Sequence, residues 1–169
     1  QEEEQQEQDA DRPEKRRNNE ERVKLSDLGE FGLIRRIASR YRTSQASTIK
    51  GIGDDAAVLS FEPDDVILIS TDQLVEDVDF RLTTTSAANL GWKSLAANES
   101  DIAAMGGVPR GFTVSLGIPG ERISLEFLDE FYRGLMSLAA ETACDLLGGD
   151  ISESGERFAV TIAIVGTAK

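Results

Sequence analysis

Three stretches of the chain carry apolar residues three or four positions apart, the spacing of one face of a helix. The first stretch follows Ser26, a residue that favours the start of a helix, and the others cover residues 86–105 and 124–143. Gly106 and Gly107 end the second stretch, because glycine commonly closes a helix. The predicted inward positions are Phe31, Ile34, Ile37, Ala38 and Tyr41 in the first helix, Leu90, Leu95, Ile102 and Met105 in the second, and Phe127, Leu128, Phe131, Leu135 and Leu138 in the third.

Shorter apolar segments lie between the predicted helices and indicate β-strands. The run 66–69 is continuously apolar rather than alternating, which predicts a strand buried on both faces. The elements follow the order α-β-β-α-β-α-β-β, which predicts a mixed α/β (α+β) domain whose helices pack on a sheet. The predicted strands are residues 56–59, 66–69, 112–118, 145–147 and 158–165.

The beginning of the chain differs from the rest in composition. Charged and amide side chains dominate residues 1–24, which bury too little apolar surface to offset the entropy lost on folding. We therefore expect a disordered tail of mixed, mainly acidic charge over residues 1–24, with a docking segment as the alternative. The folded domain is expected to cover residues 25–169.

The net charge and the counts of His and Cys argue against several functional classes. The formal net charge is -13 at pH 7 and the pI is about 4.4, which disfavours binding to nucleic acid or to an anionic membrane surface. The chain has no His and a single Cys, Cys144, so an intrachain disulfide, a Ser-His-Asp triad and imidazole-bound zinc are excluded. It has no apolar run of about 18 residues and no recognisable signal peptide. We expect a cytoplasmic protein.

Four aspartates lie beside small residues at positions that suit a metal site. Asp55 follows a loop with two glycines, Asp72 follows the apolar run, and Asp150 follows a pair of glycines. Asp101 lies inside a predicted helix, with Asn98 on the same face. Carboxylate oxygens are the ligands that Mg²⁺ prefers, and the absence of His favours Mg²⁺ over zinc or copper.

Each aspartate also has a purely structural interpretation as a cap or a turn residue. Asp101 fits that interpretation least, because Asp is unfavourable inside a helix. Neither Gly-x-x-x-x-Gly-Lys-Ser/Thr nor Gly-x-Gly-x-x-Gly occurs in the chain. Carboxylate-bound metal ions and backbone amides would therefore hold any nucleotide, an arrangement that serves phosphoryl transfer.

Four motifs follow one another along the chain: GIGDDAAV at 51–58, STDQLVE at 70–76, KSLAANESDIAAMGGVP at 93–109 and GGD at 148–150. Together they resemble the thiamine-monophosphate kinase family, a branch of the aminoimidazole ribonucleotide synthetase superfamily. The resemblance covers about residues 26–169. It implies the N-terminal domain fold of that superfamily, with helices on a roughly four-stranded mixed sheet.

The same resemblance implies an activity and a set of site residues. The activity is the ATP-dependent phosphorylation of thiamine monophosphate to thiamine diphosphate, with Mg²⁺. Gly149 and Asp150, together with Asp72, would contact the nucleotide. The sheet would pair with its copy in a second subunit, so that a homodimer forms with the nucleotide site near the interface. The implied metal ligands are Asp55, Ser70, Thr71, Asp72, Asp101 and Asp150.

Two departures from the family pattern bear on function. The family usually has a His that contacts the substrate where this chain has Asp79, so Asp79 is the expected substrate contact. Family members also continue into a second domain of similar size, so we expect little or no activity from this chain alone. The alternatives are another ATP-dependent enzyme of the superfamily, or an inactive single-domain module for dimerisation or nucleotide binding.

Overall fold

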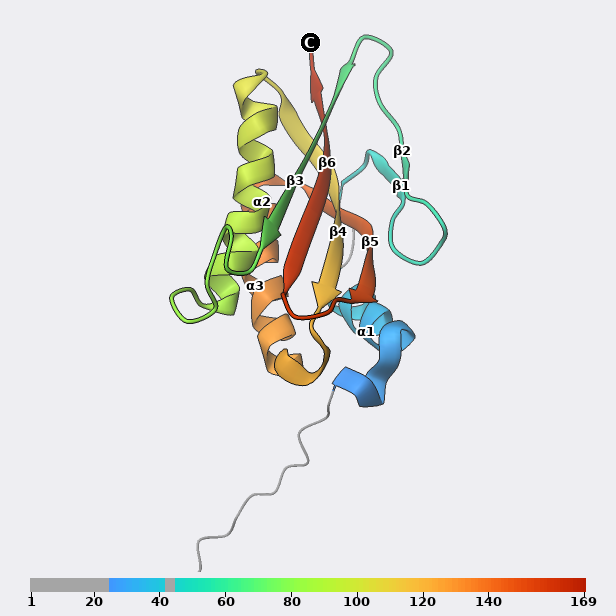
Figure 1. Ribbon diagram of the computed structural model, residues 1–169. Coiled ribbons are helices and arrows are strands. Elements are labelled where there is room, and N and C mark those ends of the chain that lie inside the picture. The colour runs from blue at the N-terminus through green and yellow to red at the C-terminus, as the bar shows by residue number, and fades with distance from the viewer. Residues whose placement is uncertain (1–24, 42–44) are drawn as a thin grey trace, which may run out of the picture.

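The computed structural model describes residues 25–41 and 45–169, so the expected tail at 1–24 lies outside the described residues. Helices and strands alternate along the chain in nearly the predicted order, with one additional short strand (Figure 1). The elements are α1 (Leu25–Arg40), β1 (Thr48–Lys50), β2 (Val58–Leu59), β3 (Val66–Val75), α2 (Ala87–Ala104), β4 (Val108–Ile118), the 3-10 turn η1 (Gly120–Arg122), α3 (Leu125–Thr142), β5 (Asp145–Glu153) and β6 (Ala159–Ala168).

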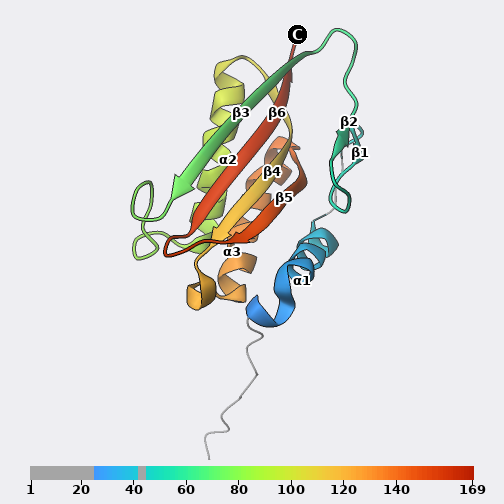
Figure 2. The same cartoon turned by 45° about the vertical axis from the view of Figure 1, so that its right-hand side comes forward.

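The main sheet has four strands in the order β3-β6-β4-β5. Strands β4 and β5 run parallel, whereas the β3–β6 and β4–β6 pairs are antiparallel. Helices α2 and α3 cover one face of this sheet, and α1 and the small β1–β2 hairpin lie on the side of β5 (Figure 2). The predicted fold, helices on a four-stranded mixed sheet, is thereby confirmed.

The core lies between the sheet and the pair α2 and α3. Leu90, Leu95 and Ile102 of α2 are buried, as are Phe131 and Leu135 of α3, which confirms these predicted inward positions. The two helices approach each other very closely, because a Cβ added at Gly91 would overlap the Phe131 carbonyl oxygen and one at Gly134 would overlap that of Ala88. Such close packing leaves α2 and α3 little freedom to shift.

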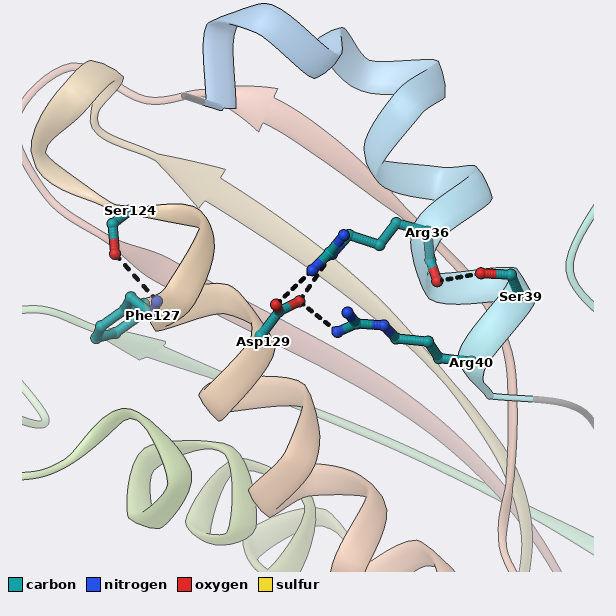
Figure 3. Close-up of polar contacts among 6 residues, drawn as sticks. All are labelled: Arg36, Ser39, Arg40, Ser124, Phe127 and Asp129. Atoms are coloured by element: carbon teal, nitrogen blue, oxygen red, sulfur yellow. Dashed lines mark hydrogen bonds and ion pairs between the residues drawn. The ribbon is translucent and has the colours of Figure 1, made fainter. Parts of the chain in front are cut away.

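Serine residues cap the first turns of α2 and α3, at the positions where the sequence predicts these helices to begin. The hydroxyl of Ser86 accepts the backbone N–H of Asn89, and that of Ser124 accepts the N–H of Phe127 at 3.1 Å (Figure 3). Helix α2 is followed by Gly106 in the left-handed region.

No helix in residues 25–41 or 45–169 is long and apolar enough to cross a membrane.

The prediction for the strand at 66–69 is wrong in two respects. Strand β3 runs on to Val75, so Asp72 lies within the strand rather than after it. The strand is not buried on both faces, because only one of its faces meets a helix, α2. Ile67 and Ile69 lie on the other face, where Ile69 is 76% exposed.

Several smaller expectations also need correction. Asp150 lies inside β5, which continues through the glycine pair instead of ending at Leu147. Met105 is 69% exposed, because it follows the last turn of α2 and lies beyond the sheet-facing stripe. Phe31 is 75% exposed although it lies on the predicted apolar face of α1. Helix α1 lies beside β5 rather than on the helix-covered face of the sheet (Figure 2).

Candidate functional site

A cavity of about 710 Å³ lies between α1, the loop after β1, and strands β4 and β5. Its apolar wall comes from Phe31, Ile34 and Ile37 of α1 together with Ile52. Its polar lining comes from the loop and from the strands. The cavity brings together three of the residues predicted from the sequence, and they are Asp55, Gly149 and Asp150.

The glycine pair gives the cavity a floor made of backbone. Gly149 pairs with Val114 of β4, and a Cβ at this position would overlap the Val114 carbonyl oxygen, so no other residue type fits without a shift. At Gly148 a Cβ would meet nothing within 4 Å. Asp150 is exposed, and its Oδ2 accepts the hydroxyl of Ser152 at 2.9 Å.

The loop opposite this floor is acidic and is held by local contacts. Asp54 forms an ion pair with Lys50 of β1, and its Oδ1 accepts the backbone N–H of Asp55 at 2.9 Å. The hydrogen bond from Lys50 is the main cause that lowers the pKa of Asp54, with the N–H of Asp55 as a second cause. Asp54 therefore shapes the loop and leaves the side chain of Asp55, which is exposed, on the cavity lining.

A second group of predicted residues lies at the opposite edge of the sheet, where β3 meets α2. This edge cluster consists of Ser70, Asp72, Asn98 and Asp101. The hydroxyl of Ser70 donates to Oδ2 of Asp101 at 2.6 Å. Asn98 is buried, and its Oδ1 accepts the backbone N–H of Asp72 at 3.0 Å while its Nδ2 donates to the carbonyl of Ser94. Asn98 thereby ties α2 to β3, with the carboxylates of Asp72 and Asp101 exposed beside it.

Thr71 does not belong to this cluster. Successive side chains of a strand point to opposite faces, so Thr71 lies on the face away from α2. Its hydroxyl donates to the carbonyl oxygen of Ile162 in β6 at 2.8 Å.

The cavity and the edge cluster are separated by the width of the sheet. Asp72 pairs with Ile162, Ile162 pairs with Val114, and Val114 pairs with Gly149, so one row of residues joins the two places. Three strand spacings of about 4.8 Å make the row about 14 Å long. Within residues 25–41 and 45–169, no group of three or more His, Cys, Asp or Glu side chains could hold a metal ion. The chain therefore presents the predicted ligands as two separate sets.

Asp79, the expected substrate contact, lies in a tight turn just after β3. Its Oδ2 accepts the backbone N–H of Val75 at 2.8 Å, and its carbonyl accepts Nζ of Lys93 at 3.2 Å. The turn is anchored by buried Glu76, which accepts the N–H of Phe158 and a hydrogen bond from Arg122. Burial acts to raise the pKa of Glu76, but these hydrogen bonds outweigh it and hold the pKa below its usual value.

Sequence reasoning missed the residues that hold the outer walls of the cavity. Oδ2 of buried Asp145 accepts both the N–H of Gln45 and the hydroxyl of Thr48, at 3.0 and 2.7 Å, and so attaches β1 to β5. Asp129 of α3 accepts hydrogen bonds from Arg36 and Arg40 of α1 (Figure 3). For Asp145 the only available signal was a lone polar residue at the start of an apolar strand, and Asp129 gave none, since α3 carries several other charged residues.

Comparison with known proteins shows the class to which this fold belongs. The chain belongs to the family described as AIR synthase related protein, N-terminal domain, which matches residues 53–168. It is 38% identical over 139 residues to the thiamine-monophosphate kinase of Bacillus subtilis and 40% identical over 130 residues to that of Synechococcus elongatus. These matches cover 82% and 77% of this chain but only 42% and 38% of the two relatives.

The similar solved structures include members of the same family. The crystal structure of thiamine-monophosphate kinase from Stenotrophomonas maltophilia superposes with a TM-score of 0.70 at 34% identity, covering 83% of this chain and 43% of that one. AaThiL complexed with AMPPCP and TMP superposes with a TM-score of 0.59 at 32% identity, covering 86% of this chain and 44% of that one. The chain therefore spans less than half the length of the proteins it matches.

Proposed function

We propose that this chain is the nucleotide- and Mg²⁺-binding domain of a cytoplasmic thiamine-monophosphate kinase. That enzyme transfers a phosphoryl group from ATP to thiamine monophosphate and forms thiamine diphosphate. The support from relatives is that several share this name and that one was solved with AMPPCP and TMP. The observation that carries the proposal is the cavity shared by Asp55, Gly149 and Asp150, three residues of the family motifs.

The cavity has the two-sided chemistry that a nucleotide needs. Phe31 and Ile34 offer an apolar wall to a flat ring, whereas Asp55 and Asp150 lie on the polar lining. Carboxylates repel phosphates unless a cation lies between them, so a nucleotide bound here requires a metal ion. In this proposal Mg²⁺ neutralises the phosphates and positions them for transfer.

The edge cluster has the donor atoms of a magnesium site. Asp72 and Asp101 are exposed carboxylates, and the hydroxyl of Ser70 lies beside Asp101. Carboxylate and hydroxyl oxygens are the ligands that Mg²⁺ prefers. In the proposal these residues hold metal ions together with Thr71, Asp55 and Asp150, while Asp79 contacts the substrate.

A homodimer would join the two half-sites. Within the described part of the chain β3 pairs only with β6, and β5 pairs only with β4. The four-stranded sheet of each subunit therefore has two edges open to a further strand. Pairing β3 of one subunit with β5 of the other closes two sheets into a barrel and removes these edges. Asp72 would then lie near Asp150 of the partner subunit. The exposed Ile67 and Ile69 support this arrangement, because they would be covered inside the barrel.

Two measurements test the proposal. Size-exclusion chromatography with light scattering at micromolar concentration should show a dimer of the 18.4 kDa chain, and a clean monomer would contradict the dimeric site. The melting temperature should rise from EDTA to Mg²⁺ and again to Mg²⁺ with ADP, because a ligand that binds only the folded state stabilises it. An unchanged melting temperature on adding Mg²⁺ would overturn the metal site.

Asp72→Asn separates a metal ligand from a structural residue. The substitution keeps the shape of the side chain and removes its charge, so the stability without metal should stay the same or rise slightly. The stabilisation by Mg²⁺ should fall sharply. Asp64→Asn, in the exposed turn before β3, is the control and should respond to Mg²⁺ like the wild type. Lower stability without metal, combined with an intact Mg²⁺ response, would show that Asp72 is structural.

A further inference from the structure

Helix α1 forms one wall of the cavity but is only lightly packed on the domain. Phe31, Ile34 and Ile37 line the cavity, and Leu33 is the one buried residue among residues 28–40. Gly29 has φ 60° and ψ 176°, which interrupts the helix two residues before Phe31. The turns that carry the cavity wall therefore gain little support from the chain before them, and other contacts must fix their position.

One such contact is an ionic clamp, formed by Arg36 and Arg40 of α1 with Asp129 of α3 and shown in Figure 3. Arg36 binds Asp129 through two atoms, with Nε 3.0 Å from Oδ1 and Nη2 2.7 Å from Oδ2. Arg40, one turn further along α1, places Nη1 2.7 Å from Oδ1 of the same carboxylate. A bidentate pair fixes orientation as well as distance, and a second arginine on the same helix face fixes the direction of the helix.

The clamp differs from the ordinary ion pairs on the surface of the molecule. Glu130, the next residue of α3, pairs with Arg133 three positions along the same helix and joins no other element. Asp129 joins two elements whose residues are 93 positions apart in the chain. The hydrogen bond from Arg36 is the main cause that lowers the pKa of Asp129, with burial opposing it and Arg40 adding to it, so the carboxylate is ionised at neutral pH.

We propose that Asp129 is a positioning residue of the nucleotide site: by binding Arg36 and Arg40 it holds α1 so that Phe31 and Ile34 stay against the bound nucleotide. This inference rests on the proposed function, because it takes the cavity to be the nucleotide site. Asp129 is not among the cavity-lining residues, so it acts only through α1. Without the clamp, residues 30–40 of α1 can move away from β5 and widen the cavity, while the packed α2 and α3 keep the sheet intact.

The experiment compares three variants of the full 169-residue chain with the wild type. Asp129→Asn removes the charge with little change of shape, and Glu130→Gln is the matched control on the same helix. A third variant reverses the polarity of the clamp by combining Asp129→Lys with Arg36→Glu and Arg40→Glu. Hydrogen exchange of the amides at 33–40 is measured without ligand, and the affinity for ADP is measured by calorimetry in excess Mg²⁺.

In Asp129→Asn the amides of α1 should exchange about fivefold faster and ADP should bind about fivefold more weakly, the factor expected for a well-formed ion pair. Exchange in β4 and β6 should stay unchanged. The control should match the wild type in both measurements, and the reversed clamp should recover at least half of the lost affinity.

Two outcomes would overturn the inference: α1 exchange that does not change in Asp129→Asn, or faster α1 exchange with unchanged ADP affinity. A failure of the proposed function gives a different result. The wild type would then bind no ADP, which removes the role of Asp129 at the nucleotide site, while the ligand-free exchange data still show whether Asp129 holds α1.

Discussion

In α3, Phe131 is completely buried and its ring meets those of Tyr132 and Phe158 edge-on, whereas in α1 Phe31 is 75% exposed. Both residues lie on apolar stripes of the same periodicity, and the sequence predicts the same inward orientation for both. The difference lies in what each helix faces. Helix α3 faces the sheet and α2, and α1 faces a cavity. An apolar stripe thus indicates that a face meets something apolar, which in α1 is the lining of the cavity.

The two regions are also held together by different forces. Helices α2 and α3 interlock through close backbone approach at Gly91 and Gly134. Helix α1 and the β1–β2 hairpin are attached through two carboxylates, Asp129 and Asp145, and through partly buried apolar residues such as Ile37 and Ile52. The edge cluster therefore stands on a packed scaffold that fixes its geometry. The walls of the cavity are held partly by polar contacts. These walls can therefore move at a lower cost in free energy than the packed helices can.

The largest expected effect is the difference in stability between two single substitutions, Phe131→Ala and Phe31→Ala. Phe131→Ala should lower the free energy of unfolding by about 3–5 kcal/mol, because it opens a cavity in a fully packed core. Phe31→Ala should change it by about 0.5 kcal/mol or less, since an exposed side chain contributes little. Urea denaturation of both variants measures the difference. Similar losses in the two variants would contradict the distinction between the two helices.

Gly134→Ala tests the close approach of α2 and α3. The added methyl group would overlap the Ala88 carbonyl oxygen, which is backbone and cannot rotate away. The helices must then separate, at a cost of about 3 kcal/mol in the free energy of unfolding. Gly155→Ala is the control, because a Cβ there meets nothing within 4 Å. If both variants unfold at the same denaturant concentration as the wild type, the scaffold is looser than the structure indicates.

Asp145→Ala tests the attachment of the hairpin. The substitution leaves the N–H of Gln45 and the hydroxyl of Thr48 without their acceptor, which should cost about 2 kcal/mol. Thr48→Val removes a single donor and should cost about half as much. Hydrogen exchange should accelerate in β1 and β2 and stay unchanged in α2, where packing rather than Asp145 provides the stability. Uniformly faster exchange throughout the domain would show that the hairpin is not a separate unit.

Most of the packed region could be predicted from the sequence, with Met105 as an exception because its side chain is exposed. Ser86 and Ser124 mark the first turns of α2 and α3, and the apolar stripes that follow them are the observed core. The physical reason is that capping and periodicity act within a few residues along the chain. The same reasoning failed for β3, because a run of apolar residues does not show whether one or both faces of its strand are covered.

The layout of the site could be predicted only in part. The motifs give the chemistry of Asp55, Asp72, Asp101 and Asp150, but their spacing along the chain does not show which edge of the sheet each will occupy. The strand order β3-β6-β4-β5 is not sequential, and it places Asp72 and Asp150 on opposite edges. The anchors Asp129 and Asp145 were missed because their partners lie roughly a hundred positions away in the chain.

The smallest effect is an acid dependence confined to the cavity side of the molecule. The hydrogen bond from Arg36 holds the pKa of Asp129 below its ordinary value of 3.8 in the folded protein. A carboxyl group with a lowered pKa contributes stability that is fully present above its unfolded pKa and is lost as the pH falls through the folded one. The wild type should therefore lose stability below about pH 4 that Asp129→Asn does not lose.

Subtracting the two unfolding curves isolates this contribution, because the lowered pKa of Glu76 acts in both proteins and cancels. Asp129 is about one third exposed, so solvent screening limits the contribution to about 1 kcal/mol or less. Arg36→Gln removes the largest cause of the lowered pKa and should lose most of the same acid dependence. A difference curve that stays flat from pH 6 to pH 2 would mean that the clamp does not hold α1 in solution. Helix α1 would then rest on its apolar contacts, among them those of Leu33 and the stacking of Tyr41 against Tyr132.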